Sequence, residues 1–303
     1  MKYAVTGAAG FIGSHLSEAL VAAGHEVVGL DCFTDYYDPA LKEENARGLD
    51  VRRVDLAEDE VDFAGLDGVF HLAGQPGVRS FGDVFPLYLR RNVLASQRVF
   101  EAAARDGARV VFSSSSSVYG AAERYPTSES TVPHPLSPYG ITKLACEQLA
   151  AAYVREFDLD CVTLRYFNAF GPRQRPDMAF SRIVFALAAG THFDLYGDGE
   201  QSRGWTYVSD VVDATMLAME RGRAVYNVGG AIEASMNETI GLLEQISGRR
   251  LDVSRGPVVP GDQRRTNADT ERIRADLGWQ PRVSLEDGLR SQWEWASSRV
   301  AAG

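Results

Sequence analysis

The stretch YAVTGAAGFIG, Tyr3–Gly13, decides the fold of this chain. Its first residues are typical of a short buried strand, and the apolar periodicity that follows over Ile12–Ala23 is typical of a helix. Three evenly spaced glycines lie between the two elements. In such a turn the first glycine permits a tight bend, the second lets the backbone approach a pyrophosphate, and the third allows close packing of helix and strand. Since the helix N-terminus adds free N–H groups, we predict that the turn binds a dinucleotide through Gly7, Gly10, Phe11, Ile12 and Gly13.

An acidic residue follows the second predicted strand, Glu26–Leu30. Asp31 lies close to the ~20-residue spacing past the glycines at which a carboxylate binds the adenosine ribose, and an acid there favours NAD over NADP. Further cofactor contacts are predicted where the next two strands end: Asp55, Leu56, Leu72 and Ala73. For Asp55 a plain turn acid is nearly as good an interpretation, and His71 is predicted to be a core histidine rather than a catalyst.

Strand and helix patterns alternate through the first half of the chain. Strand patterns over Val69–Leu72 and Arg109–Ser113 are interleaved with amphipathic stretches over Leu87–Arg105 and Thr142–Phe157. Because this alternation requires crossover connections, it predicts a doubly wound α/β fold: a parallel sheet of the Rossmann type with helices on both faces. After Arg165 the chain is less regular and richer in Gly and Pro, which indicates a smaller, mixed α/β lobe over the carboxyl edge of the sheet.

The predicted domain boundary is interleaved. Residues 1–167 form the dinucleotide-binding domain, and residues 205–230 return to it because Val208–Arg221 has a helix pattern and Ala224–Val228 a strand pattern. Residues 168–204 and 231–303 form the second lobe.

Composition narrows the function classes. The formal net charge is −10, and no Lys/Arg run exceeds a pair, so neither a nucleic acid nor a membrane surface is an expected partner. The three cysteines Cys32, Cys146 and Cys161 lack the spacing of a disulfide framework, which favours the cytoplasm. The five histidines lack metal-ligand spacing, so no metal is expected.

Tyr139 and Lys143 carry the sharpest chemical signal. They are four residues apart and therefore lie on one face of a predicted helix. A free phenol is a poor base at neutral pH, but a neighbouring ammonium and a cationic nicotinamide favour the phenolate. Upstream, the serine run that includes Ser113 and Ser115 follows a buried strand and offers hydroxyls at the carboxyl edge of the sheet.

Seven motifs resemble, in order along the chain, those of the extended short-chain dehydrogenase/reductase superfamily and, within it, the nucleotide-sugar 4-epimerases. They are GAAGFIG, HLAGQPGVR, SSSSSVYG, SPYGITK, RYFNAFGPR, LYGDG and TYVSD. The resemblance implies that Tyr139 is the base, Lys143 its partner and Ser115 the catalytic hydroxyl. It also implies NAD as cofactor, with Asn92, Ser113 and Tyr166 beside it together with Tyr139 and Lys143.

The same resemblance implies a UDP-sugar in the second lobe, with uracil beside Phe193–Tyr196. The implied substrate contacts are Arg79, Ser115, Ser116, Asn168, Arg175, Ala179, Arg182, Tyr196, Arg203, Asp262 and Arg264. A homodimer formed through Leu87–Arg105 and Thr142–Phe157 is likewise an expectation from the family.

The reaction expected is epimerisation. Sister families that remove water or carbon dioxide carry acids beside the catalytic hydroxyl, whereas this chain has Ser116 and Ser117 there. Without a general acid for carbons 5 and 6 of the sugar, return of the hydride is the outcome left. The segments DYYDPALK and GPRQRPDMA resemble UDP-glucuronate 4-epimerases, in which the arginine at the position of Arg175 faces the sugar carboxylate; a guanidinium fork suits that group.

Three alternatives stay open. Asn168 stands where some glucuronate enzymes have Thr, so a UDP-glucose or UDP-N-acetylglucosamine 4-epimerase is the nearest rival, and there Arg175 is a solvated loop residue. A catalytically silent NAD-binding protein shares the fold, because fold does not fix function. An NAD-dependent dehydrogenase that releases NADH is the third.

Overall fold

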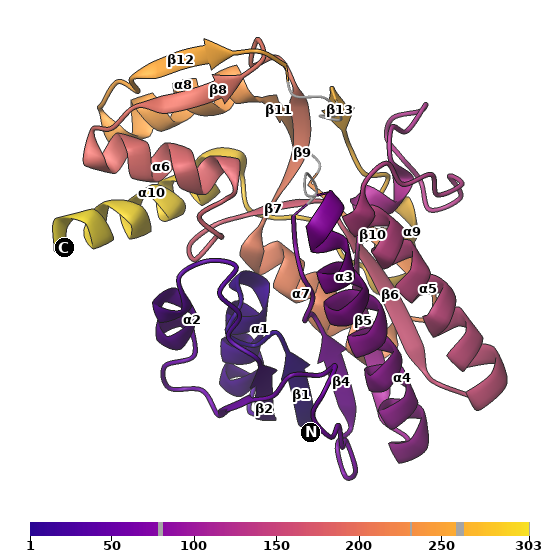
Figure 1. Ribbon diagram of the computed structural model, residues 1–303. Helices are drawn as coiled ribbons and strands as arrows, with labels where there is room; N and C mark the ends of the chain where they lie inside the picture. The colour runs from indigo at the N-terminus through magenta and orange to yellow at the C-terminus, as the bar shows by residue number, and fades with distance from the viewer. Residues whose placement is uncertain (78–80, 231, 259–263, 303) are drawn as a thin grey trace.

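A parallel sheet forms the centre of the computed structural model, which describes the whole chain except residues 78–80, 231, 259–263 and 303 (Figure 1). The strand order is β10-β6-β5-β4-β1-β2-β3, and every neighbouring pair is parallel. The strands are β1 (Lys2–Thr6), β2 (Glu26–Asp31), β3 (Val51–Arg53), β4 (Gly68–His71), β5 (Arg109–Ser115), β6 (Cys161–Tyr166) and β10 (Val225–Val228). The chain runs outward from β1 to β3 and returns to β4 on the other side of β1. Ligands of open α/β sheets bind at the carboxyl ends of the strands where the order reverses in this way.

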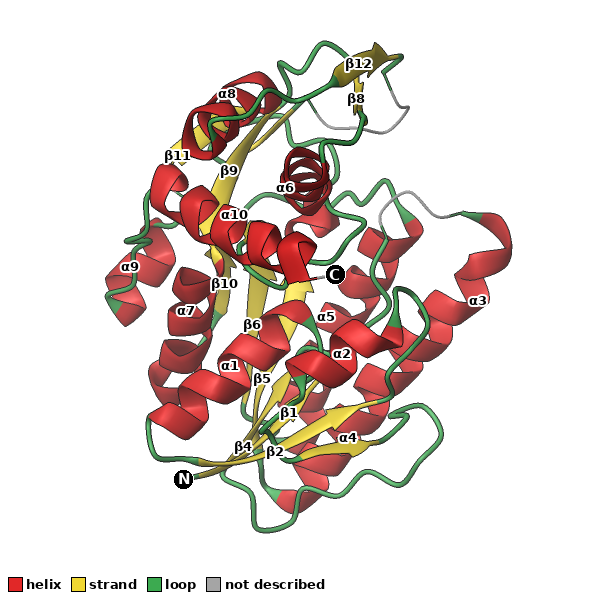
Figure 2. Ribbon diagram, turned by 90° about the vertical axis from the view of Figure 1, so that its left-hand side faces the viewer, coloured by secondary structure: helices red, strands yellow, loops and turns green. Residues whose placement is uncertain are grey.

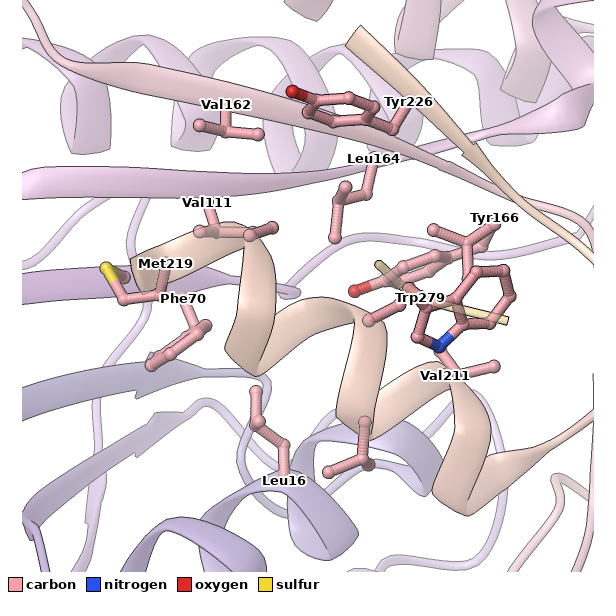
Figure 3. Close-up of a cluster of buried hydrophobic side chains, with 14 of the residues drawn as sticks. Leu16, Phe70, Val111, Val162, Leu164, Tyr166, Val211, Met219, Tyr226 and Trp279 are labelled. Carbon is pink, nitrogen blue, oxygen red and sulfur yellow. The ribbon is translucent and has the colours of Figure 1, made fainter. Parts of the chain in front are cut away.

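Helices cover both faces of this sheet. The helices α1 (Phe11–Ala22) and α7 (Val208–Arg221) pack on one face, and α4 (Ala95–Asp106) and α5 (Pro138–Phe157) on the other. Side chains of a strand alternate between faces, so in β1 Val5 packs under α1 and α7, whereas Ala4 packs under α4 and α5. Figure 3 shows part of the apolar cluster between the sheet and α1 and α7. The short elements are α2 (Pro39–Asn45), η1 (Gly82–Val84), α3 (Phe85–Tyr88), η2 (Leu89–Leu94) and η3 (Ser116–Tyr119).

A smaller lobe lies at the carboxyl end of the sheet, since it begins with β7 directly after β6 (Figures 1 and 2). Its strands form two small sheets, one containing β7, β9, β11 and β13 and the other β8 and β12. Helices α6, α8 and α10 enclose its own apolar core. The bounds are β7 (Asn168–Phe170), α6 (Ala179–Ala189), β8 (Phe193–Tyr196), β9 (Ser202–Tyr207), β11 (Ile232–Ser235), α8 (Met236–Ser247), β12 (Val253–Gly256), β13 (Arg265–Thr266), α9 (Glu271–Leu277) and α10 (Leu285–Ala302).

The predicted doubly wound sheet is confirmed, and α7 has the predicted bounds. The division into two domains stays a prediction, and one part of it differs from the packing. The predicted lobe includes all of 231–303. In the structure, however, α9 packs against α7 and β10, because Ile273 and Leu277 belong to the core on the α1–α7 face of the large sheet. Among the described residues, no helix is long and apolar enough to cross a lipid bilayer.

Candidate active site

A cavity of about 350 Å³ opens at the carboxyl ends of the large sheet, between it and the smaller lobe. One end is lined by the glycine turn after β1 and by the ends of β2 and β4. The other end is lined by the serine run at the end of β5, by the start of α5 and by the segment that follows β6. The predicted residues that line it are Gly7, Gly10, Phe11, Ile12, Gly13, Asp31, Asp55, Leu56, Leu72, Ala73, Ser113, Ser115, Ser116, Tyr139, Lys143, Tyr166, Asn168 and Arg175.

The glycine turn leaves no room for side chains. Gly7 has a φ of +72°, which favours glycine, and a Cβ on Gly13 would lie 2.1 Å from the Gly7 carbonyl oxygen. Gly10 caps α1 without a side-chain hydrogen bond, so the first N–H groups of the helix remain available to a ligand. The turn is therefore a backbone cradle for an anionic group.

Asp31 lies beside this cradle. Its carboxylate accepts hydrogen bonds from the Ala9 N–H at 3.1 Å and the Phe33 N–H at 2.8 Å, which fixes its orientation at the end of β2. On the same side of the cavity, Arg91 donates to the Gln75 side chain at 2.8 Å while its buried Nε has no hydrogen-bond partner in the described part of the chain. The Asp31 carboxylate, the glycine turn and the unpaired Nε of Arg91 together fit a dinucleotide.

Lys143 is fixed in a buried position next to the serine run. Its ammonium donates to the Ser113 carbonyl at 2.8 Å and lies 6.0 Å from the centre of the Tyr139 ring. Helix α5 starts at this point because Ser137 caps it, accepting from the Gly140 N–H at 3.1 Å. A Cβ on Gly140 would lie 2.5 Å from the Ser117 carbonyl oxygen, so the helix start packs tightly on η3. Tyr139 and Ser115 are thus presented to the same cavity.

His71 is a core histidine, as predicted. Its two ring nitrogens are hydrogen-bonded to Thr6 at 2.8 Å and Ser96 at 2.9 Å. Burial, with a smaller contribution from the Lys143 charge, lowers the pKa of His71 to about 3. The ring is therefore neutral, and Lys143 carries the positive charge behind Tyr139.

Two residues predicted at the cofactor make structural contacts as well. The Tyr166 hydroxyl is hydrogen-bonded to Thr215 at 2.7 Å, and burial raises its pKa, so this residue presents a neutral ring to the cavity. Asn92 does not line the cavity. It lies behind the wall, where its side-chain oxygen accepts from the Gln75 N–H at 2.7 Å and its amide donates to Thr142 at 3.1 Å.

Arg175 lies at the mouth of the cavity, in the segment between β7 and α6. Two of its N–H groups donate to the two carboxylate oxygens of Asp177, each at 3.0 Å. Asp177 also accepts from the Tyr36 hydroxyl at 3.2 Å, which joins the lobe to the loop after β2. Burial and the Asp177 charge raise the pKa of Tyr36 to about 12. The nearby Asn168 amide donates to the Thr266 hydroxyl at 2.9 Å.

Several predicted substrate contacts are not brought into this cavity. Arg182 lies over the Phe193 ring, 5.0 Å from its centre, and the exposed Arg264 pairs with Asp198 at 2.9 Å. The Arg203 guanidinium donates to the Ser202 carbonyl at 2.8 Å. Ala179, Arg182, Tyr196, Arg203 and Arg264 are thus placed in the lobe away from the cavity lining. Arg79 and Asp262 lie outside the described residues.

Sequence reasoning missed part of the lining. Tyr36, Tyr37 and Lys42 close the cavity over the end of β2, and Lys42 donates to Thr34 there. They occur in the segment DYYDPALK, which was singled out only for its resemblance. Arg91 and Gln75 were also missed, because nothing in the spacing of these two residues indicates that they pair.

Comparison with known proteins defines the class. An NAD-binding cradle beside a Tyr–Lys pair is the arrangement of a pyridine-nucleotide enzyme, and residues 3–229 match the family described as "NAD dependent epimerase/dehydratase family". The chain belongs to this family. The predictions of family, fold and NAD are confirmed.

Three relatives illustrate the range within the family. The structure is similar to UDP-glucuronic acid 4-epimerase from Bacillus cereus in complex with UDP-glucuronic acid and NAD, with a TM-score of 0.93, 37% identity, and coverage of 99% of this chain and 100% of that one. A UDP-glucuronate 4-epimerase from Thermodesulfobacterium geofontis is 30% identical over 98% of this chain and 97% of its own length. A UDP-glucose 4-epimerase from Mycolicibacterium smegmatis is 37% identical over 97% and 98%.

Proposed function

We propose that the protein interconverts UDP-glucuronate and UDP-galacturonate by inverting carbon 4 of the sugar. The observation that carries this proposal is Arg175, a partly buried guanidinium that lines the same cavity as Tyr139 and Ser115. A carboxylate is the sugar substituent that a guanidinium fork binds best. Asp177 engages the Nε edge of the guanidinium, which leaves Nη1 for a second acceptor.

The proton chemistry follows from the side chains around the cavity. Tyr139 takes the proton of the 4-hydroxyl and later returns it, and the Lys143 ammonium behind it stabilises the phenolate. Ser115 hydrogen-bonds the reacting hydroxyl; its Oγ accepts from the Ser117 N–H at 3.2 Å, which orients it. When bound, NAD would be held by the glycine turn and Asp31, and it would accept the hydride from carbon 4 and return it.

The serines beside Ser115 restrict the outcome to epimerisation. Ser116 and Ser117 both line the cavity where an acid would be needed for elimination at carbons 5 and 6. A hydroxyl is too weak an acid or base for that step at neutral pH. A guanidinium that clamps the carboxylate also opposes decarboxylation of the 4-keto intermediate.

A second candidate is a 4-epimerase of neutral UDP-sugars. Asn168 favours it, because the amide of this side chain is engaged with Thr266 and the residue offers no hydroxyl to a sugar carboxylate. The relative from M. smegmatis, named a UDP-glucose 4-epimerase, fits the same reading. The two candidates differ in the contribution of Arg175.

The test compares two substrates and two arginine variants. We expect purified protein to convert UDP-glucuronate without added cofactor. Arg175→Met should lose about 10- to 100-fold in kcat/KM on this substrate, since a charge-assisted hydrogen bond contributes about 1.5–3 kcal/mol. Conversion of UDP-glucose changes less than about threefold. Arg250→Met, which removes the same charge from an exposed site just after α8, is the matched control. Equal losses on both sugars, or no loss on the glucuronate, would refute the carboxylate assignment.

We also infer a homodimer. Large apolar side chains are exposed on η2 (Leu89, Leu94) and on α5 (Ile141, Val154, Phe157), and α5 packs along η2 and α4. A second copy that packs on these adjacent helices would cover them. All three cysteines are free, which is consistent with a reducing compartment.

A further inference from the structure

A buried ion pair lies between α5 and β6, behind the wall that carries Tyr139 and Lys143. Arg165 on β6 donates to both carboxylate oxygens of Glu147 on α5, at 2.6 and 3.0 Å. Each side chain is only 7% exposed. The fork geometry therefore operates in a site from which water is excluded.

The pair is extended by hydrogen bonds on both sides. The Ser114 hydroxyl on β5 donates to the Glu147 carboxylate, and Arg165 donates to the Tyr119 hydroxyl at 2.8 Å. Tyr119 in turn donates to Asn227 on β10 at 2.7 Å. All these side chains are buried, so one network joins α5 to three neighbouring strands.

Each member of the pair is one step from a residue of the candidate site. Glu147 follows Lys143 by one helical turn, and Arg165 directly precedes Tyr166. Ser114 stands between Ser113, whose carbonyl accepts from Lys143, and Ser115. The network thus contacts α5, β5 and β6 next to the residues of the candidate site that each of them carries.

Stability alone does not explain this arrangement. Removing two charges from water costs free energy that their attraction scarcely offsets, so apolar side chains of the same volume would hold α5 on the sheet equally well. Two consequences are specific to the ion pair. The bidentate geometry of the pair allows only one arrangement of α5 on β5 and β6. Because the two charges are opposite and adjacent, the pair adds almost no net electrostatic potential at Tyr139.

We propose that Glu147 and Arg165 are positioning residues for proton transfer, because they fix α5 against the ends of β5 and β6. Since the pair has no net charge, Lys143 is the nearby charge that stabilises the Tyr139 phenolate. This inference rests on Tyr139 being the base of the proposed function.

The other titratable groups around Tyr139 and Lys143 leave this balance intact. Burial keeps His71 on β4 neutral and raises the pKa values of Cys146 on α5, Tyr166 on β6 and Tyr119 after β5, so all four are uncharged. Arg175 faces Tyr139 from the lobe and is paired with Asp177. Breaking the Glu147–Arg165 pair would therefore add one uncompensated charge.

The test removes one charge and then both. In Glu147→Gln the Arg165 cation stays and stabilises the phenolate. Eight residues of helix separate positions 139 and 147, about 12 Å, and a unit charge at that distance shifts a titration by about one pH unit at an effective dielectric constant of about 20. The acidic limb of the kcat profile should move down by about one unit, and in Glu147→Gln/Arg165→Met it should return to the wild-type position.

Ser114→Ala tests the geometric part without a change of charge. It should lower kcat about tenfold with KM changed less than twofold and no shift of the profile. Melting temperature and NAD content of every variant identify folding defects, and Ser114→Ala alone decides the positioning claim if Glu147→Gln does not fold. Loss of kcat with an unmoved acidic limb in Glu147→Gln, or wild-type kinetics in Ser114→Ala, would overturn the inference. Tyr139→Phe with full activity would instead refute the proposed function.

Discussion

Replacing Gly13 by alanine provides the most direct test of the cofactor cradle. The new Cβ would lie 2.1 Å from the Gly7 carbonyl oxygen and 2.8 Å from the Gly7 carbonyl carbon. The first contact is about 1 Å shorter than non-bonded atoms tolerate, and both partners are backbone, so no side chain can swing away. Relief requires the turn to open or α1 to shift by about 1 Å.

Such overpacking costs about 1–3 kcal/mol, and rigid backbone partners place Gly13→Ala at the upper end. Because the same turn must hold the pyrophosphate, we expect NAD to bind about 100-fold more weakly. Calorimetric titration of protein stripped of nucleotide measures the affinity. Gly241→Ala is the matched control: this helical glycine has no atom near the added Cβ, so the substitution should leave NAD affinity unchanged and stabilise α8 by about 0.5–1 kcal/mol. NAD affinity of Gly13→Ala within threefold of wild type would refute the reasoning.

Two further predictions concern stability and assembly. His71 has a folded-state pKa of about 3, below its unfolded value, so the unfolded state binds more protons between pH 6.5 and 3. The free energy of unfolding therefore decreases as the pH is lowered through that window. Between pH 7.5 and 5 the wild type should lose about 2 kcal/mol more of its unfolding free energy than His71→Gln, and equal losses in urea titrations would contradict this. Phe157→Asp places a charge in the inferred dimer face and should yield monomers in sedimentation experiments, whereas Val132→Asp, at an 81% exposed site elsewhere, should not. A monomeric wild type would refute the dimer.

Local patterns were enough to predict the large sheet and the cofactor half of the site. The glycine turn, Asp31 and the Tyr139–Lys143 spacing all depend on residues close together in the chain, and the structure places them along one cavity. The parallel, doubly wound arrangement also followed, because alternating strands and helices require crossover connections.

The sugar half could not be predicted to the same depth. Tyr36 contacts Asp177, the partner of Arg175, across the two lobes, and their separation of 141 residues gives no pairing signal. The same holds for Glu147 and Arg165, which look like ordinary surface charges until α5 is placed on β6. The resemblance places Arg264 at the substrate, whereas in this structure its exposed guanidinium pairs with Asp198.

The two halves of the cavity differ in the groups that line them, and this difference affects how substrate specificity can change. The cofactor half combines backbone groups of the glycine turn with the Asp31 carboxylate, which that turn holds in place. Under the proposed function the sugar half depends on Asn168 and Arg175, side chains of a segment that the Arg173–Glu18 ion pair joins to α1. Substitutions at 168 and 175 can therefore alter the sugar that is accepted while β5 and α5, which hold the proton machinery, stay in place. For this reason the identity of these two residues, rather than the fold, separates the glucuronate reading from the neutral-sugar reading.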